Sequence, residues 1–264
     1  MKIKKIVPFC LILVLSASIF AVTDSEARTL LKMAEANTAF FESDFTAQCI
    51  VVQDKPGEDK SETRATLHRR DKTSKWTILI NAPEKDKGKG YLQSDETVWF
   101  YDPADGRFTF TSARDTFQGT NANTSDFAPQ YYARNYKIEK HSEVKLGSYD
   151  CVLVELTASV KNVEYPKMRL WISKNDGFVR KREDYSLSGK KLRTLAIPSY
   201  QSVSLGSEKR SVPVNMVIQD ELRGKKIGGK MQNERTTIVL SSPSFSKLDD
   251  SVYTKPYLEL MSAR

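Results

Sequence analysis

The side chains that could carry catalytic or metal chemistry are few in this sequence. Its histidines, His68 and His141, stand far apart and each lies beside charged residues, so they cannot form a metal-ligand cluster. The sequence has no G-x-S-x-G, H-E-x-x-H or P-loop motif and no plausible Ser/His/Asp set. We therefore expect a protein that is not an enzyme, with no metal and no cofactor.

The side chains that do stand out are aromatic, and they gather in residues Gly90–Phe127. This stretch predicts an extended segment, a strand at Thr97–Tyr101, a turn, and a second strand at Arg107–Thr111. A polar loop rich in Gly, Asn, Thr and Ser follows. So many large rings on short strands indicate that the chain encloses an apolar volume, either an ordinary core or a compartment for an apolar ligand.

The strand Thr97–Tyr101 is apolar on both of its sides. Side chains alternate along a strand, so Trp99 and Tyr101 share one face while Val98 and Phe100 share the other. Apolarity on both faces indicates that both are covered. A helix on one side with a cavity on the other would do this, and so would two layers of core.

The N-terminus has the pattern of a secretory signal. Three lysines precede an apolar run at Ile6–Phe20, and Ala21 offers a cleavage site. The run is shorter than the ~20 residues that a membrane span needs. We expect residues 1–21 to be cleaved, with an uncleaved anchor as the alternative. Cys10 lies inside the run without a lipobox, so we do not expect lipidation.

Removal of this signal leaves two cysteines and a modest positive charge. Cys49 and Cys151 both lie in strand-like runs and form either two buried thiols or one bridge. The whole chain has 41 Lys and Arg against 33 Asp and Glu, a net charge of +8. The signal holds three lysines and no acids, so the remainder has 38 against 33, or +5. This dilute surplus argues against nucleic-acid binding.

The positive charge is concentrated at three places. These are His68-Arg69-Arg70, the run from Lys85 to Lys89, and Arg223-Gly224-Lys225-Lys226. Such clusters either hold a protein near an anionic membrane surface or keep hairpin loops soluble. The sequence leaves both interpretations open.

The periodicity predicts one domain over residues 22–264, with a helix followed by many strands. Thr23 and Glu26 form a capping-box pattern, and apolar residues then recur at helical spacing over residues 24–42. About ten antiparallel strands follow, and Tyr257–Met261 could form a terminal helix. A sheet of that length is expected to curl around its apolar face. The predicted strands, besides the two aromatic ones, are Ser43–Gln53, Glu62–Arg70, Lys75–Asn81, Tyr149–Val160, Lys167–Ser173, Phe178–Leu187, Lys190–Ile197, Val212–Leu222 and Lys230–Leu240.

Several motifs, in this order, resemble a known family. They are P-x-x-x-x-G-x-G-Y-L from Pro83, W-F-Y-D-P from Trp99, F-x-G-T from Phe117 with S-D-F from Ser125, and R-L-W-I-S-K-N-D-G-F-V-R-K at Arg169–Lys181. Together they resemble the LolA-like outer-membrane lipoprotein-sorting family, in its exported bacterial, spirochaete-type branch. The resemblance covers about Ala34 to Leu248.

The resemblance implies a mainly β (α+β) fold. This is an incompletely closed antiparallel β-barrel of about ten or more strands, with an N-terminal amphipathic helix and short helices covering the opening. It implies a monomeric periplasmic carrier that shields acyl chains of lipids or lipoproteins between an inner-membrane donor complex and an outer-membrane acceptor, with transient contact to membrane surfaces. Well-known carriers of this kind secure their cover with a buried arginine, and no motif matches that arginine here.

The residues that we expect to line an acyl-chain cavity are large apolar side chains on the predicted strands, with two helix residues as a lid. Any one of them could instead be ordinary core. The candidates are Leu30, Phe41, Trp76, Ile78, Ile80, Trp99, Tyr101, Phe108, Phe110 and Trp171.

Three functions fit this sequence. The first is a periplasmic carrier of lipids or lipoproteins. The second is an envelope-stress sensory or regulatory module of the same fold, which signals through a membrane protein. The third is a ligand-free β-scaffold in an envelope assembly, whose interior is filled by its own side chains.

Overall fold

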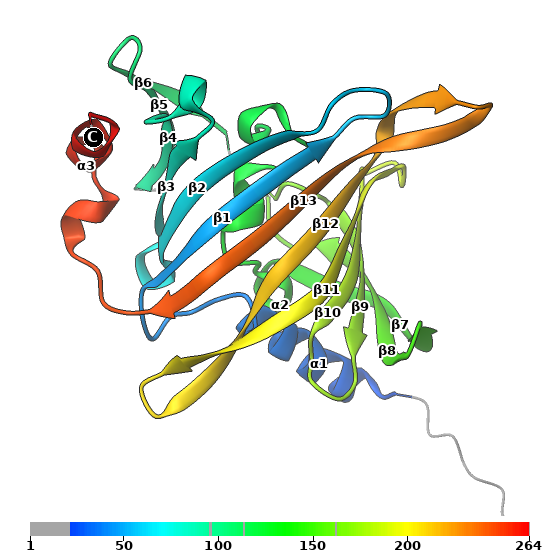
Figure 1. The fold of residues 1–264 in the computed structure, drawn as a ribbon. Helices are drawn as coiled ribbons and strands as arrows, with labels where there is room; N and C mark the ends of the chain where they lie inside the picture. The colour runs from blue at the N-terminus through cyan, green and yellow to red at the C-terminus, as the bar shows by residue number, and fades with distance from the viewer. Residues whose placement is uncertain (1–21, 95–96, 113, 162, 264) are drawn as a thin grey trace, which may run out of the picture.

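The structure is a computed structural model that describes residues 22–94, 97–112, 114–161 and 163–263. The expected signal peptide, with Cys10, lies outside the described residues. A single antiparallel sheet of 13 strands dominates the fold (Figure 1). Its strand order is β6-β5-β4-β3-β2-β1-β13-β12-β11-β10-β9-β8-β7. Because β6 and β7 stand at the two ends and do not pair, the sheet is an incompletely closed barrel, as the resemblance implied.

The strands have the following bounds. They are β1 (Phe45–Asp54), β2 (Ser61–Arg70), β3 (Lys75–Ala82), β4 (Gly90–Ser94), β5 (Thr97–Asp102), β6 (Arg107–Thr111), β7 (Tyr136–Leu146), β8 (Tyr149–Ala158), β9 (Lys167–Ser173), β10 (Val179–Tyr185), β11 (Lys191–Leu205), β12 (Glu208–Ile227) and β13 (Lys230–Phe245). The α-helices are α1 (Asp24–Ala36), α2 (Tyr132–Asn135) and α3 (Lys255–Ser262), and short 3₁₀ turns include η3 (Phe117–Gly119), η4 (Thr124–Phe127) and η5 (Asp250–Tyr253).

The order of the strands forces one long crossing of the sheet. The chain enters at the middle with β1 and runs outward, strand by strand, to β6 at one edge. It then passes to β7 at the opposite edge and returns through β8 to β13, which pairs with β1. Residues 114–135 make this passage, and we call them the covering segment. They contain η3, η4 and α2, and they lie behind the sheet in Figure 1.

The N-terminal helix begins where the sequence predicts. The backbone N–H of Thr23 donates to Glu26 Oε2 at 2.8 Å, and the N–H of Glu26 donates to Thr23 Oγ1 at 3.3 Å, so the capping box is confirmed. The helix ends at Ala36 and not at residue 42. The backbone that follows is bonded instead to the turn after β2, because Asp71 Oδ2 accepts from the Phe40 N–H at 2.8 Å.

The two faces of the sheet carry separate apolar clusters. Trp76, Ile78 and Ile80 of β3 belong to the main core, which fills the side covered by α1 and the covering segment. A smaller cluster holds Leu258 of α3 against the opposite face. The predicted cover on both faces of the strand at β5 is therefore confirmed, since Val98 belongs to the main core and Tyr101 to the cluster under α3.

The sequence missed one strand entirely and shortened others. The strand β7 is a polar edge strand whose side chains, after Tyr136, are mostly exposed or half-buried, so it carries no apolar alternation. The strands β11 and β12 run for 15 and 20 residues, well beyond their apolar parts, because their outer ends pair with each other or with β13 away from the core. Periodicity detects burial, and these segments are not buried.

The two cysteines of the described chain are free and buried. Burial raises the pKa of the Cys49 thiol to about 12, which makes it an unreactive thiol. Of the two alternatives that the sequence left open, the structure has two buried thiols. No helix among the described residues has the length and apolarity to cross a membrane.

We expect α3 to be held to the sheet chiefly by Leu258, whose side chain is fully buried. Leu258→Ala should lower the free energy of unfolding by about 2–5 kcal/mol, because it leaves a cavity between α3 and β4. Urea unfolding measures this loss. The exposed neighbour Leu260 is the matched control, and Leu260→Ala should change stability by less than about 0.5 kcal/mol. Equal effects of the two substitutions would contradict the assignment.

Candidate functional site

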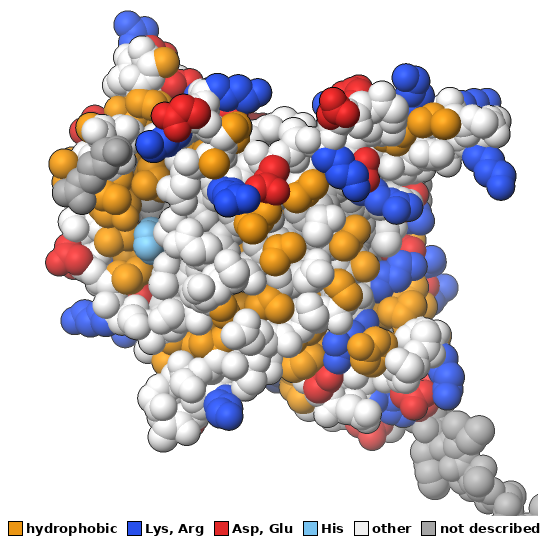
Figure 2. Space-filling model, in the orientation of Figure 1, with side chains coloured by type: hydrophobic (Ala, Val, Ile, Leu, Met, Phe, Trp, Pro, Cys, Tyr) orange, Lys and Arg blue, Asp and Glu red, His pale blue; other side chains and the backbone are white. Residues whose placement is uncertain are grey.

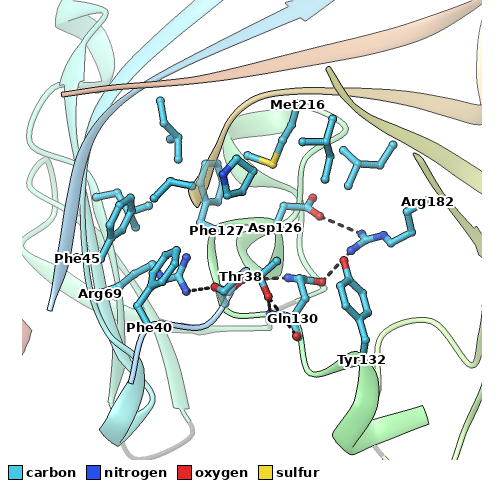
Figure 3. Close-up of a pocket in the computed structure, with 17 residues that line it drawn as sticks. Thr38, Phe40, Phe45, Arg69, Asp126, Phe127, Gln130, Tyr132, Arg182 and Met216 are labelled. Atoms are coloured by element: carbon cyan, nitrogen blue, oxygen red, sulfur yellow. Dashed lines mark hydrogen bonds and ion pairs between the residues drawn. The ribbon is translucent and has the colours of Figure 1, made fainter. Parts of the chain in front are cut away.

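A small apolar cavity lies between the middle of the sheet and the covering segment. Its volume is about 40 Å³, which leaves room for no more than a few water molecules (Figure 3). Six strands that are neighbours in the sheet supply most of its wall, in the order β2, β1, β13, β12, β11 and β10. The turn η4 and the turn after α1 close it. The apolar lining residues are Phe40, Phe45, Leu67, Phe127, Ala128, Leu195, Ile197, Val212, Pro213, Met216 and Leu240.

One side of this cavity is polar and joins the cover to the sheet (Figure 3). The guanidinium of Arg69 donates to the backbone oxygen of Thr38 at 2.8 Å. The hydroxyl of Thr38 accepts from the backbone N–H of Gln130 at 3.2 Å, and the side-chain oxygen of Gln130 accepts from Arg182 at 2.8 Å. This chain of bonds runs from Arg69 of β2 to Arg182 of β10, through Thr38 in the turn after α1 and Gln130 of the covering segment.

Four buried charged residues form an ion cluster beside the cavity. Arg182 of β10 and Arg193 of β11 both contact Asp126 of η4, at 3.3 and 2.7 Å. Arg193 donates two hydrogen bonds to the Asp126 carboxylate. Both arginines also contact Asp184 of β10, at 3.0 and 2.7 Å. All four side chains are at most 6% exposed. The sheet therefore contributes two cations and one anion, and the cover contributes the anion that makes the cluster neutral.

The two arginines of this cluster keep Asp126 ionised. Burial alone would raise the pKa of Asp126, but the Arg193 and Arg182 guanidiniums outweigh it and hold that pKa below its ordinary value. Asp126 thus stabilises the closed cover whenever it is ionised, and this contribution is lost only as the pH falls through its depressed pKa. Because the arginines are charged at all accessible pH values, the cluster stays intact near neutrality.

The covering segment is bonded to the sheet at a second place. The backbone N–H of Asn121 donates to Thr236 Oγ1 at 2.9 Å and to Gln53 Oε1 at 3.2 Å. Thr120 and Asn121 are buried against β1 and β13. The polar loop predicted after β6 is therefore a buried part of the cover and not an exposed hairpin loop.

Glu164, in the connection between β8 and β9, anchors the middle of the covering segment. Its carboxylate accepts hydrogen bonds from the Asn123 amide and the Ser125 hydroxyl. Burial raises the pKa of Glu164 above its ordinary value of 4.5, although the Arg193 charge opposes the shift. This carboxyl group is therefore less well compensated than Asp126.

A larger pocket opens on the other side of the covering segment. Its volume is about 640 Å³, within the range of ligand pockets, and tyrosines supply much of its wall. Ala128, Gln130 and Tyr132 line both this pocket and the small cavity. These three residues thus form the partition between a ligand-sized pocket and the apolar interior.

The structure places the ten sequence candidates in different surroundings, and none of them lines the small cavity. Leu30, Trp76, Ile78 and Ile80 belong to the main core around it. Trp99, Tyr101 and Phe108 belong instead to the cluster under α3.

The remaining three candidates lie on or near the surface. Phe110, opposite Trp99 in the β5–β6 pair, is 73% exposed. Trp171 is half-buried, with the Lys181 ammonium 4.2 Å from its ring centre, and Phe41 is 36% exposed. Whether any of the ten contacts a lipid stays a prediction.

Neither the charged cluster nor the wall of the small cavity was predicted from the sequence. The two buried arginines of this cluster, Arg182 and Arg193, lie on adjacent strands. The available signal was the alternation of R-K-R-E-D in β10, which places Arg182 and Asp184 on one face, and S-D-F in the covering segment. Among the described residues, no group of three or more His, Cys, Asp or Glu side chains could hold a metal ion.

Comparisons with known proteins agree with this architecture. A family model described as an uncharacterized protein matches residues 72–260. A search of curated proteins found no match. Among solved structures, a LolA superfamily protein from Nitrosomonas europaea is similar at a TM-score of 0.70 and 20% identity, over 88% of this chain and 98% of that one.

Two further solved structures share the fold. A putative outer membrane lipoprotein-sorting protein domain from Vibrio parahaemolyticus has a TM-score of 0.71 and 19% identity, over 88% of this chain and 97% of its own. A DUF1329 family protein from Desulfovibrio piger has a TM-score of 0.73 and 15% identity, over 89% of this chain and 98% of its own. At these identities the similarity is one of fold.

We predict that Glu164 makes stability fall as the pH rises. Its raised pKa means that the folded chain binds a proton more tightly than the unfolded chain does. Its contribution is therefore fully present below the ordinary value near 4.5 and is lost as the pH rises through the raised pKa. Urea unfolding across this pH range should show the loss in the wild type, and Glu164→Gln should remove it. An unchanged pH profile in that variant would contradict the assignment.

Proposed function

We propose that this chain, which belongs to the family whose model matches residues 72–260 and has the LolA superfamily fold, is a non-catalytic carrier of acyl chains. The observation that carries the proposal is the partition of Ala128, Gln130 and Tyr132, whose residues line both a ligand-sized pocket and the small apolar cavity. An acyl chain gains about 0.8 kcal/mol for each methylene that leaves water. A dry interior behind a movable partition suits such a ligand.

The closed state is too small to hold an acyl chain. Ligand pockets occupy about 300–1,000 Å³, whereas the apolar cavity has about 40 Å³. The covering segment must therefore move away from the sheet when the carrier is loaded. The residues that would meet the chain are those of the cavity wall, with Leu30, Trp76, Ile78 and Ile80 of the surrounding core joining as the interior widens.

Movement of the cover also leaves an unbalanced charge. When Asp126 departs, Arg182 and Arg193 keep only Asp184 as a buried partner, so the sheet retains a net positive charge. An anionic group on the ligand would replace Asp126 at favourable distances, and guanidinium groups bind carboxylate and phosphate well. We therefore propose that the cargo is an acyl lipid with an anionic group near the chain.

The cellular setting of this function follows from the sequence. The signal-like N-terminus and the LolA-like fold support a carrier that works in the periplasm between two membranes. It would receive its cargo from a donor at one membrane and release it to an acceptor at the other. Transient contact with either membrane surface is part of this proposal.

The small size of the cavity favours one alternative. A β-scaffold filled by its own side chains would look the same in the closed state. The two functions differ in whether the cover opens for a ligand, which is a measurable property.

Binding of a fluorescent fatty acid should depend on the cavity wall. Met216 lies in that wall, and Met216→Trp should fill the space and weaken binding by at least about fivefold, since overfilling of a packed interior costs about 1–3 kcal/mol. Leu187→Trp, at an exposed turn residue outside the cavity wall, is the matched control and should bind as the wild type does. Fluorescence titration measures both. Equal affinity in all three proteins would place any binding outside the cavity.

Weakening the cover should strengthen binding. Asp126→Asn removes the ion pairs with the two arginines from the closed state and leaves the open state, which already lacks them, unchanged. It should therefore raise the open fraction and lower the apparent Kd about tenfold for each 1.4 kcal/mol by which the closed state is destabilised. A fatty acid should bind the wild type more tightly than its methyl ester, because the ester has no anion for the arginines. If neither the wild type nor this variant binds any acyl compound, the scaffold function stands.

A further inference from the structure

The hairpin of β12 and β13 extends beyond the body of the protein (Figure 1). All residues from Leu222 to Gln232 are exposed, and the two strands pair only with each other from Gly224 to Asn233. Six residues of strand, from Leu222 to Ile227, reach about 20 Å at ~3.3 Å each. We call residues 222–233 the projecting hairpin.

The projecting hairpin is strongly basic. It carries Arg223, Lys225, Lys226 and Lys230, and no acidic residue lies between Glu221 and Glu234. In the described part of the chain, its three lysines form no ion pair, and Arg223 only approaches Asp220, at 3.8 Å. Its charges are therefore free to meet an external partner.

The other two basic clusters of the sequence serve the fold instead. Arg69 is bonded to Asp71 at 2.6 Å and Arg70 to Asp44 at 2.7 Å, both within the structure. In the second cluster, Lys89 lies 3.0 Å from Asp86 and 3.5 Å from Asp102. Residues of these two clusters therefore form ion pairs within the fold, whereas the three lysines of the projecting hairpin form none among the described residues.

Exposed apolar side chains accompany the charges of the projecting hairpin. Leu222, Ile227 and Met231 are 53%, 37% and 58% exposed. The register pairs Lys226 with Met231 and Ile227 with Lys230, so each face of the ribbon carries one apolar side chain and at least one lysine next to the turn. Figure 2 shows apolar and basic side chains together on this extension. An end-on approach buries both apolar side chains, whereas a flat approach buries only one.

The base of the projecting hairpin is braced. Asp220 Oδ1 accepts from the N–H groups of Leu222 and Arg223 at 2.7 and 2.8 Å, and its backbone oxygen accepts from the Asn233 amide at 2.6 Å. The turn between β1 and β2 lies alongside the projecting hairpin, because a Cβ atom added to Gly57 would lie 3.4 Å from Lys225 Nζ. That turn brings two cations and three anions, counting from Asp54 to Lys60, so the combined tip remains positive.

We propose that the projecting hairpin is the element that docks this protein end-on to an anionic lipid surface. The lysines would pair with lipid headgroups while Ile227 and Met231 enter the interface. This deepens the proposed carrier function by naming the surface that meets the membrane. A nucleic-acid or acidic-protein partner would use the cations equally well, but it gives no role to apolar side chains on both faces of the tip.

Vesicle flotation of the exported protein tests the docking surface. The protein should bind phosphatidylethanolamine vesicles that contain phosphatidylglycerol and should not bind phosphatidylcholine vesicles, with binding weakened by salt. Replacing Lys225, Lys226 and Lys230 by Gln should reduce the partition coefficient on the order of 100-fold, at roughly fivefold for each lysine. Replacing Ile227 and Met231 by Ser should reduce the binding that persists at high salt.

The matched control removes the same charge elsewhere. Lys85, Lys87 and Lys145 are exposed, and their replacement by Gln should leave vesicle binding within about twofold of the wild type, as expected for charges outside the contact. Equal loss in the two triple variants would show attraction by net charge alone and overturn the proposal, as would binding of polyanions but not of vesicles. Met216→Trp, which blocks the cavity, should still dock, so a failure of docking and a failure of acyl binding are distinguishable.

Discussion

A buried ion cluster fastens the covering segment to the sheet. A carboxylate on a four-residue turn of the cover satisfies two buried guanidiniums on adjacent strands. Without it, the sheet side of the cluster would hold two buried cations against one anion, and an unbalanced buried charge is costly. The cover is therefore held in place by the requirements of the sheet as much as by its own apolar contacts.

The strand order explains why such a fastening is needed. Because the chain starts in the middle of the sheet, its passage from β6 to β7 must run across the whole concave side. A segment of this length with only short helical turns cannot make its own hydrogen bonds throughout, so side chains supply them. Gln53 and Thr236 both accept from the backbone N–H of Asn121, and Glu164 accepts from the Asn123 side chain further along the passage. The covering segment is thus attached by polar contacts at several places, and the cavity behind it has an apolar wall with one polar side.

The sequence predicted the features that depend on local pattern. The capping box at Thr23, the alternation of Trp76, Ile78 and Ile80, and the two-sided apolarity of Thr97–Tyr101 all follow from spacing along one element. The resemblance added the open barrel, which no single spacing gives. The cavity could not be predicted in this way, because its wall combines one or a few residues from each of many elements that are distant in sequence. Aromatic rings on β5 and β6 drew attention to that region, yet Trp99 and Phe108 pack under α3, since a strand with two apolar faces does not reveal which face is the interior.

In the proposed carrier, the energetics of opening would set the kind of ligand that the interior accepts. Removing one partner from a buried ion cluster costs about 3–5 kcal/mol, which equals the burial of about four to six methylene groups. For a short acyl chain, the free energy gained by burial would be no larger than the cost of displacing the covering segment. Nothing would then offset the loss of entropy on association. A long chain exceeds the cost, and an anionic group that replaces Asp126 beside Arg182 and Arg193 lowers it further. Release then follows from the same balance, because return of Asp126 to the arginines favours the closed, nearly filled interior as soon as an acceptor holds the chain.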